Sequence, residues 1–226
     1  MVQSIVDGVF IGKVEDLWPG KAPSAINKMM ASGSQQVGKL GFLRDAQADL
    51  KVHGGVDKAI HHYPADHYAA WQAEADIPSD AVPAAFGENI SSRGIVETDL
   101  CIGDVLRLGT ALVQVSQGRQ PCWKLNNHTG NPTMAFRFQE TGRTGWYYRV
   151  LEDGCVGEGD EISLLERSHD AWTVHRVTKA RLTRRVDAEE ALALSQMSEL
   201  AVNWREAFSR MAEGHRQENT TPRLEG

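Results

Sequence analysis

The stretch CIGDVLRLGTALVQVS, residues 101–116, decides the fold class of this chain. It contains two apolar runs of β-forming residues, VLRL at 105–108 and ALVQVS at 111–116. Only Gly109 and Thr110 separate the two runs, and a two-residue link of this kind predicts a β-hairpin.

The residues that lead into the hairpin form a pattern that occurs twice. Cys101 begins a Cys–aliphatic–Gly sequence, a Gly-Asp pair follows, and alternating apolar residues come next. The same order returns from Cys155 in CVGEGDEISLLE. Two Gly-Asp turns that each feed a strand are typical of a closed or partly closed barrel, in which the turns form corners. We therefore predict a mainly β (α+β) fold built on a β-barrel with peripheral helices.

Two helices are expected to interrupt the β region. Residues 63–75 place Pro64 at a position suited to the first turn of a helix. The segment NPTMAFRFQETG offers Asn131 as an N-cap, Pro132 at the first helical position and Gly142 as a terminator.

The character of the sequence changes after residue 168. Asp187, with Glu190 three residues later, predicts the start of a helix. Apolar residues then recur at helical spacing at Leu200, Trp204, Phe208 and Met211. With an earlier segment at 174–182, they predict a small module of about three helices. We expect a barrel domain at 1–167, the helical module at 168–216 and a polar, disordered tail at 217–226.

Composition narrows the classes of protein that need to be considered. The net charge of −6 argues against general binding of nucleic-acid polymers. No apolar run approaches the length that crosses a bilayer, and the first residues lack the basic and apolar regions of a secretory signal. Three cysteines without a small-domain framework favour a reducing compartment. The expectation is a cytoplasmic enzyme with no membrane contact.

Cys122 is the cysteine with the strongest functional features. It lies in QVSQGRQPCWKL, where Pro121 stiffens the backbone. Arg119 and Lys124 are close along the chain, and cationic neighbours favour the thiolate form. From this chemistry alone, Cys122 could be a nucleophile, a redox thiol or a metal ligand. Cys101 and Cys155 occupy equivalent places before their turns and are expected to be structural.

Two glycine-containing segments offer candidate binding residues. KVHGGVDKAIHHYP places His53, Gly54 and Gly55 ahead of Lys58, and such backbone amides can cradle a phosphate. The alternative is a tight turn before a helix. FGENISSRG could orient a ligand through Asn89 or be an ordinary loop. A zinc hydrolase, P-loop NTPase, α/β-hydrolase or Rossmann enzyme is not favoured, because the motifs of these classes do not occur in the sequence.

In chain order, these segments resemble the MOSC family, named for the C-terminal domain of molybdenum-cofactor sulfurase. The resemblance is closest to its stand-alone bacterial YiiM-type members, runs from about residue 10 to 167, and extends to a three-helix module that often follows. It is carried by KAPSAINK, KVHGGVDKAIHHYP, FGENISSRGI, CIGDVLRLG, VSQGRQPCWKL and GRTGWYYRVLEDGCVGEGDEI. The family commonly has Pro-Arg-x-Pro-Cys, and Gly118 replaces the first proline here.

The resemblance implies a role for each candidate residue. The cysteine at the position of Cys122 supplies a sulfur ligand to molybdenum held by a pterin dithiolene, and a soft thiolate suits such a metal. Arg119 and Lys124 would help to hold the anionic cofactor, Mo-molybdopterin, which ends in a phosphate. Further cofactor-binding candidates are His53, Gly54, Gly55, Lys58, Asn89, Arg44, Ser24, Lys28 and His61.

The implied function is a molybdenum-cofactor oxidoreductase that reduces N-hydroxylated compounds, such as hydroxylamino nucleobases. The sequence contains no flavin or nicotinamide fingerprint and no cysteine cluster at iron–sulfur spacing, so electrons are expected from a separate reductase. The alternative is a carrier of sulfur or cofactor that uses a Cys122 persulfide without turnover. The basic segment at 175–185 would be either a solvated helix face or a docking surface for an acidic partner.

Overall fold

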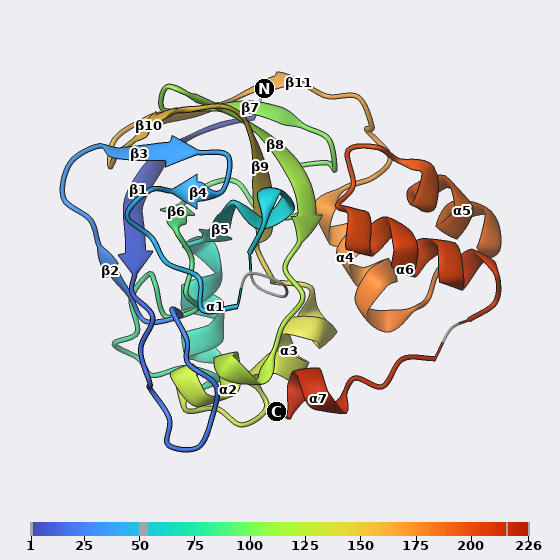
Figure 1. Cartoon of the computed structure of the whole chain (residues 1–226), viewed down its shortest axis with the longest axis horizontal. Helices are drawn as coiled ribbons and strands as arrows, with labels where there is room; N and C mark the ends of the chain where they lie inside the picture. Colours follow the sequence, from blue (N-terminus) through green and yellow to red (C-terminus); the bar gives the residue numbers. More distant parts are fainter. Residues whose placement is uncertain (1, 50–53, 216, 226) are drawn as a thin grey trace.

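The computed structural model describes residues 2–49, 54–215 and 217–225. Within these residues, seven strands form a closed β-barrel in the order β11-β7-β8-β9-β5-β6-β1, and β1 pairs with β11 to close it (Figure 1). The barrel strands are β1 (Gln3–Gly12), β5 (Ile60–Pro64), β6 (Ile90–Ser92), β7 (Val105–Leu108), β8 (Ala111–Gly118), β9 (Trp146–Glu152) and β11 (Glu161–Glu166). The predicted barrel is confirmed.

The hairpin that predicts the barrel is present with the expected register. Strands β7 and β8 pair antiparallel, with Leu108 opposite Ala111 across the two-residue turn. The two Gly-Asp turns are also built alike. Asp104 accepts a hydrogen bond from the amide of Cys101 at 2.8 Å, and Asp160 accepts one from the amide of Gly157 at 2.8 Å. Each aspartate therefore closes a turn by binding the amide three residues before it, and strands β7 and β11 follow these turns.

Short strands extend the barrel on one side. Strand β2 (Lys28–Met30) continues the sheet beyond β1, and β3 (Gln35–Gly38), β4 (Gly41–Phe42) and β10 (Gly154–Val156) form a separate small sheet. The 3-10 turn η1 (Val56–Lys58) precedes β5.

Helix α1 (Asp66–Ala73) starts later than the sequence predicts. Pro64 is not in the first turn of the helix but is the last residue of β5, opposite Ser92. The amide of Ala65 also donates to the carbonyl of Ser92, at 2.8 Å. The parallel pairing with β6 therefore holds the chain extended up to the helix, which explains why the prediction for Pro64 is wrong.

Helix α3 (Met134–Thr141) ends as predicted, because Gly142 adopts the left-handed conformation of a C-cap. The predicted N-cap at Asn131, with Pro132 next, is wrong. The side-chain oxygen of Asn131 accepts from the amide of Thr133 at 2.9 Å, so it stabilises a turn before the helix. Helix α2 (Trp123–Thr129) was not predicted.

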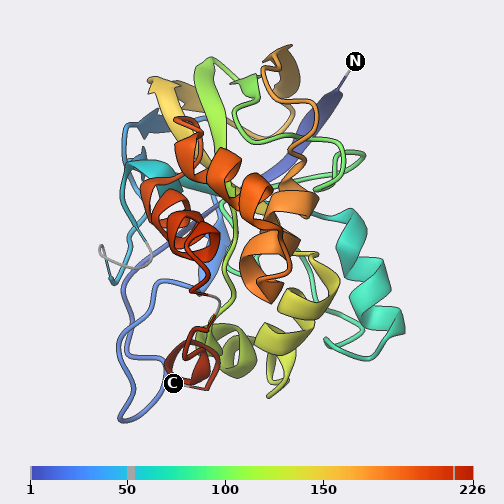
Figure 2. The same cartoon turned by 90° about the vertical axis from the view of Figure 1, so that its right-hand side faces the viewer.

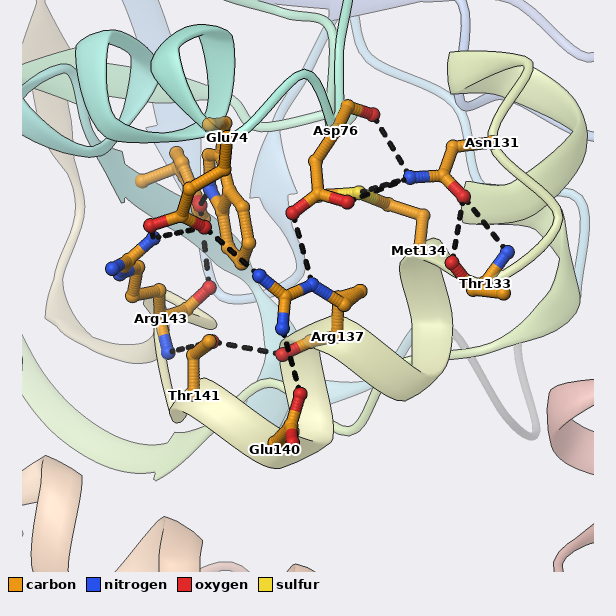
Figure 3. A network of polar contacts seen from close by, with 11 residues as sticks. Glu74, Asp76, Asn131, Thr133, Met134, Arg137, Glu140, Thr141 and Arg143 are labelled. Carbon is orange, nitrogen blue, oxygen red and sulfur yellow. Dashed lines mark hydrogen bonds and ion pairs between the residues drawn. The ribbon is translucent and has the colours of Figure 1, made fainter.

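An ionic network joins the end of α1 to α3 (Figure 3). Arg137 contacts Glu74 at 3.0 Å and Asp76 at 2.9 Å, while Arg143 contacts Glu74 at 2.9 Å. Beneath this network, the rings of Trp71 and Phe138 stack, with their centroids 5.6 Å apart. These contacts give the helical side of the barrel a second, smaller hydrophobic core.

Helices α4 (Val174–Thr183), α5 (Ala188–Gln196) and α6 (Val202–Ala212) lie together on one side of the barrel, with α4 beside β8 and α5 beside α6 (Figures 1 and 2). Asp187 caps α5 as expected, since its side chain accepts from the amide of Glu190 at 2.7 Å. Buried residues of these helices belong to the same hydrophobic cluster as the barrel interior.

The segment after the helices has a described conformation, although we expected disorder over 217–226. A short helix, α7 (Thr221–Leu224), lies beside α2 (Figures 1 and 2). No helix in the described residues is both long and apolar enough to span a bilayer.

Candidate functional site

One cavity gathers residues from segments that are far apart in the sequence. Its walls include the loop before β2, residues 45–48, strands β5 and β9, and the loop from β8 to α2. Eight of the sequence-predicted site residues line it together: Ser24, Lys28, Lys58, His61, Asn89, Arg119, Cys122 and Lys124.

The charge of the cavity is opposite to that of the whole chain. Among the described lining residues there are four basic side chains, and Asp45 is the only carboxylate. The chain itself carries a net charge of −6. A cleft lined by one sign of charge concentrates ligands of the opposite sign, so this arrangement favours an anionic ligand.

Cys122 lies directly before α2, with extended backbone angles of φ −140° and ψ 166°. Strand β8 ends at Gly118, so three residues separate the strand from this cysteine. The thiol is partly exposed and contributes to the cavity wall. The carbonyl of Cys122 accepts from the amide of Leu125 at 3.0 Å, which ties the loop into the first turn of the helix.

Arg119 is buried beside His61. Its amide donates to the carbonyl of Gly145 at 3.2 Å, and its guanidinium donates to the carbonyl of Phe86. The guanidinium is also 3.5 Å from Nδ1 of His61. Burial, with Arg119 as the second cause, holds the pKa of His61 well below its usual value. His61 is therefore neutral and lies next to a fixed cation.

Lys28 and Asp45 form a buried ion pair at the wall of the cavity. The Lys28 ammonium donates to both carboxylate oxygens, each at 2.6 Å. Asp45 also accepts from the amide of Gly12 at 2.7 Å and from the side chain of Asn89 at 2.8 Å. Burial lowers the pKa of Lys28, although Asp45 opposes this shift. Asn89 further accepts from the amide of His61 at 3.1 Å, so it joins this pair to β5.

The other cations reach the cavity from different sides. Lys124 donates to the carbonyl of Pro23 at 2.9 Å and so links α2 to the N-terminal loop. Burial lowers the pKa of Lys58, while the charges of Asp57 and Cys122 act in the opposite direction. The phenol of Tyr147 also lines the cavity, and burial raises its pKa, so it remains protonated.

Gly87 is required where the chain passes close to Ile26. Its φ is +72°, and a Cβ atom added there would lie 2.6 Å from Cγ1 of Ile26. A side chain at this position would therefore push two cavity walls apart.

Of the remaining predicted residues, Arg44, Gly54 and Gly55 are not among the described residues that line this cavity. Arg44 donates to Gln35 at 3.4 Å and lines a separate groove beside Met29 and Met30. Gly55 precedes η1 with φ +98°, so with Gly54 it belongs to the turn that carries Lys58. The role of these glycines as a phosphate cradle stays a prediction. His53 lies outside the described residues.

The cavity also includes residues that the sequence analysis did not select, notably Asp45, Gln47 and Tyr147. Tyr147 lies between the buried Trp146 and Tyr148 in β9, and neighbouring residues of a strand face opposite sides. This alternation could have identified Tyr147 as facing away from the side on which its two neighbours are buried. Asp45 follows Arg44 directly in the sequence, and of these two neighbours Asp45 lines the cavity while Arg44 lines the separate groove.

Cys101 and Cys155 lie outside the cavity lining. Cys101 is buried, its thiol is 3.6 Å from the carbonyl of Asp170, and burial raises its pKa. Cys155 lies in β10, opposite Gln36. Both positions fit the structural role expected of them.

Several cations of the basic segment at 175–185 have partners within the chain. Arg176 pairs with Glu190, while Arg181 and Arg184 both pair with Glu218. Lys179 donates to the carbonyl of Glu140. These contacts within the chain leave fewer of the segment's charges for an acidic partner, and the choice between a solvated helix face and a docking surface stays a prediction.

A family model for the MOSC domain matches residues 49–163. The chain belongs to the MOSC domain family. Protein YiiM of Escherichia coli is 37% identical over 221 residues, which cover 96% of this chain and 97% of that protein. The crystal structure of YiiM from Escherichia coli matches with a TM-score of 0.81 and 30% identity, over the full length of both chains. A protein named Reductase from Gibberella moniliformis is 40% identical over 72% of this chain and 30% of its own length.

The MOSC domain is associated with the molybdenum cofactor, and the donor set of the cavity fits such a group. No group of three or more His, Cys, Asp or Glu side chains in the described part of the chain is arranged to hold a metal ion. A cofactor that brings most of the metal's ligands therefore fits the described lining better than a bare metal ion does. A dithiolene supplies sulfur ligands, Cys122 could add one more, and the surrounding cations match an anionic phosphate.

Proposed function

We propose that this MOSC protein is a molybdenum-cofactor oxidoreductase that reduces N-hydroxylated compounds, with Cys122 as the protein ligand of the metal. The observation that carries the proposal is the convergence of one partly exposed thiol and three basic side chains, besides the internally paired Lys28, on a single cavity of an acidic protein. The relative named Reductase supports the oxidoreductase class.

The side chains around the cavity have distinct parts in this proposal. Arg119 and Lys124 would bind the phosphate end of the cofactor, and Lys58 would balance the charge near Cys122. The pair of Lys28 and Asp45 would be a rigid wall rather than a phosphate ligand, since each partner already neutralises the other. When bound, the cofactor supplies two-electron transfer.

The reduction consumes two electrons and two protons. An N-hydroxylamine becomes an amine, the N–O bond breaks, and the oxygen leaves as water. Tyr147 carries a phenolic proton at the cavity wall, and we assign it to hydrogen-bond the substrate oxygen. Neutral His61, held between Arg119 and the carbonyl of Thr144, would help to keep the arginine in place.

The central test is a Cys122→Ser variant expressed where the molybdenum cofactor is made. We expect the variant to lose bound molybdenum or turnover of an N-hydroxylated substrate, because a hydroxyl is a harder and poorly ionised ligand. Cys155→Ser is the matched control and should keep both. Metal content and turnover that survive in Cys122→Ser would contradict the proposal. A persulfide on Cys122 in metal-free, inactive protein would instead support the carrier alternative.

A further inference from the structure

The C-terminal segment reaches the loop that carries Cys122. The guanidinium of Arg223 donates to the carbonyl of Pro121, the residue directly before that cysteine. It also donates to Oε1 of Gln139 at 3.0 Å, and Asn126 donates to the carbonyl of Leu224 at 3.0 Å. Three hydrogen bonds therefore join α7 to the loop before α2, to α2 itself and to α3.

The same segment is fixed at its other end to the helical module. Glu218 pairs with Arg181 at 2.9 Å and with Arg184; Arg181 is in the last turn of α4, and Arg184 is the C-cap residue of that helix. Burial opposes ionisation of Glu218, but hydrogen bonds from the two arginines outweigh it and lower its pKa to about 2. The carboxylate is therefore charged at any ordinary pH.

We propose that residues 217–225 form a strap that sets the position of Cys122, with Arg223 as a positioning residue. Glu218 fastens the strap to α4, and Arg223 holds the carbonyl of Pro121. Proline has no N–H, so the backbone of residue 121 can be held by a hydrogen bond only at its carbonyl. A forked guanidinium that spans Pro121 and Gln139 replaces that missing constraint.

The strap gives the helical module a role at the cavity, although no residue of α4, α5 or α6 lines it. The consequence for catalysis rests on the proposed function of Cys122. The claim that Arg223 positions the loop before Cys122 does not depend on that function, because it concerns the metal-free chain.

The test is hydrogen–deuterium exchange of the metal-free protein, followed in peptides that cover residues 122–126. For Arg223→Ala we expect these amides to exchange on the order of 10-fold faster, while those of β9 keep their rate. Arg223→Lys should show a smaller increase, because an ammonium lacks the fork. The exposed Arg185, in Arg185→Gln, is the matched control and should change nothing.

Unchanged exchange at 122–126 in Arg223→Ala would overturn the proposal, and so would an equal rise throughout the barrel. A second readout uses Arg223→Ala loaded with the cofactor. In this variant kcat should fall on the order of 10-fold while the molybdenum content stays unchanged. If Cys122→Ser keeps both its metal and its turnover while the exchange result holds, the proposed function fails and the strap stands.

Discussion

The buried pair of Lys28 and Asp45 predicts a large coupling energy, which a double-mutant cycle can measure. Both side chains are only 7% exposed, and the ammonium and carboxylate are 2.6 Å apart. At an effective dielectric constant of about 20, the Coulomb attraction at this separation is about 6 kcal/mol. Desolvation opposes it, as the lowered pKa of Lys28 shows. We expect a net coupling of about 2–4 kcal/mol.

Each single variant leaves a different buried charge without its partner. Lys28→Met leaves a buried carboxylate that still accepts from the Gly12 amide and from Asn89, so a loss of about 3 kcal/mol is expected. Asp45→Asn leaves the ammonium of Lys28 without its counter-charge. The double variant should be more stable than the sum of the two losses implies, since neither charge remains.

The assay is urea unfolding followed by tryptophan fluorescence, with the cycle calculated from free energies at a constant m-value. Arg93 and Asp7 provide the matched control. Their side chains are 66% and 31% exposed, so their cycle should give less than about 1 kcal/mol. Equal coupling in the two cycles would refute the reasoning, because burial would then add nothing to the interaction.

Three further predictions concern packing, pH and electron supply. Gly118→Ala should destabilise the protein by about 1–3 kcal/mol in the same urea assay, because the new Cβ would lie 1.8 Å from Oγ1 of Thr178. A loss below about 0.5 kcal/mol would contradict this prediction and show that α4 can move away from the new methyl group. Burial lowers the pKa of His62 from 6.5 to about 3. Between these pH values the unfolded chain binds more protons than the folded chain, so the free energy of unfolding should fall by up to about 1.4 kcal/mol for each pH unit of acidification. His62→Gln should reduce that slope, and an unaltered slope would assign it to other groups. Purified protein loaded with cofactor should reduce an N-hydroxylated substrate with reduced viologen but not with NADH; efficient turnover with NADH alone would reveal a second redox site in the chain.

The barrel could be predicted because its evidence is local. The two-residue turn at Gly109 and Thr110, and the aspartates that close the two Gly-Asp turns, act within a few residues of the strands they start. Pro64 shows the limit of local reasoning. Its place in β5 depends on pairing with Ser92, which is far along the chain, and helix propensity gives no information about that partner.

The basic residues and the thiol of the candidate site could be picked out from the sequence, but Asp45 and the arrangement of the site could not. Cys122, Arg119 and Lys124 lie within one short segment whose composition is visible in the sequence. The pairing of Lys28 with Asp45 joins a strand to a loop 17 positions later and follows only from the closed barrel. The contact of Arg223 with Pro121 spans 102 positions and has no local signal at all.

The closure of the barrel sets the order in which the strands of this protein can pair during synthesis. Strand β1 contains residues 3–12, and its partner β11 begins only at residue 161. On the ribosome, β1 must wait for most of the chain before it gains that neighbour, and such distant pairings form slowly. A chain released before residue 161 has unpaired strand edges at both sides of the opening. Edges of this kind pair with other chains, so incomplete translation products of this protein should aggregate rather than fold.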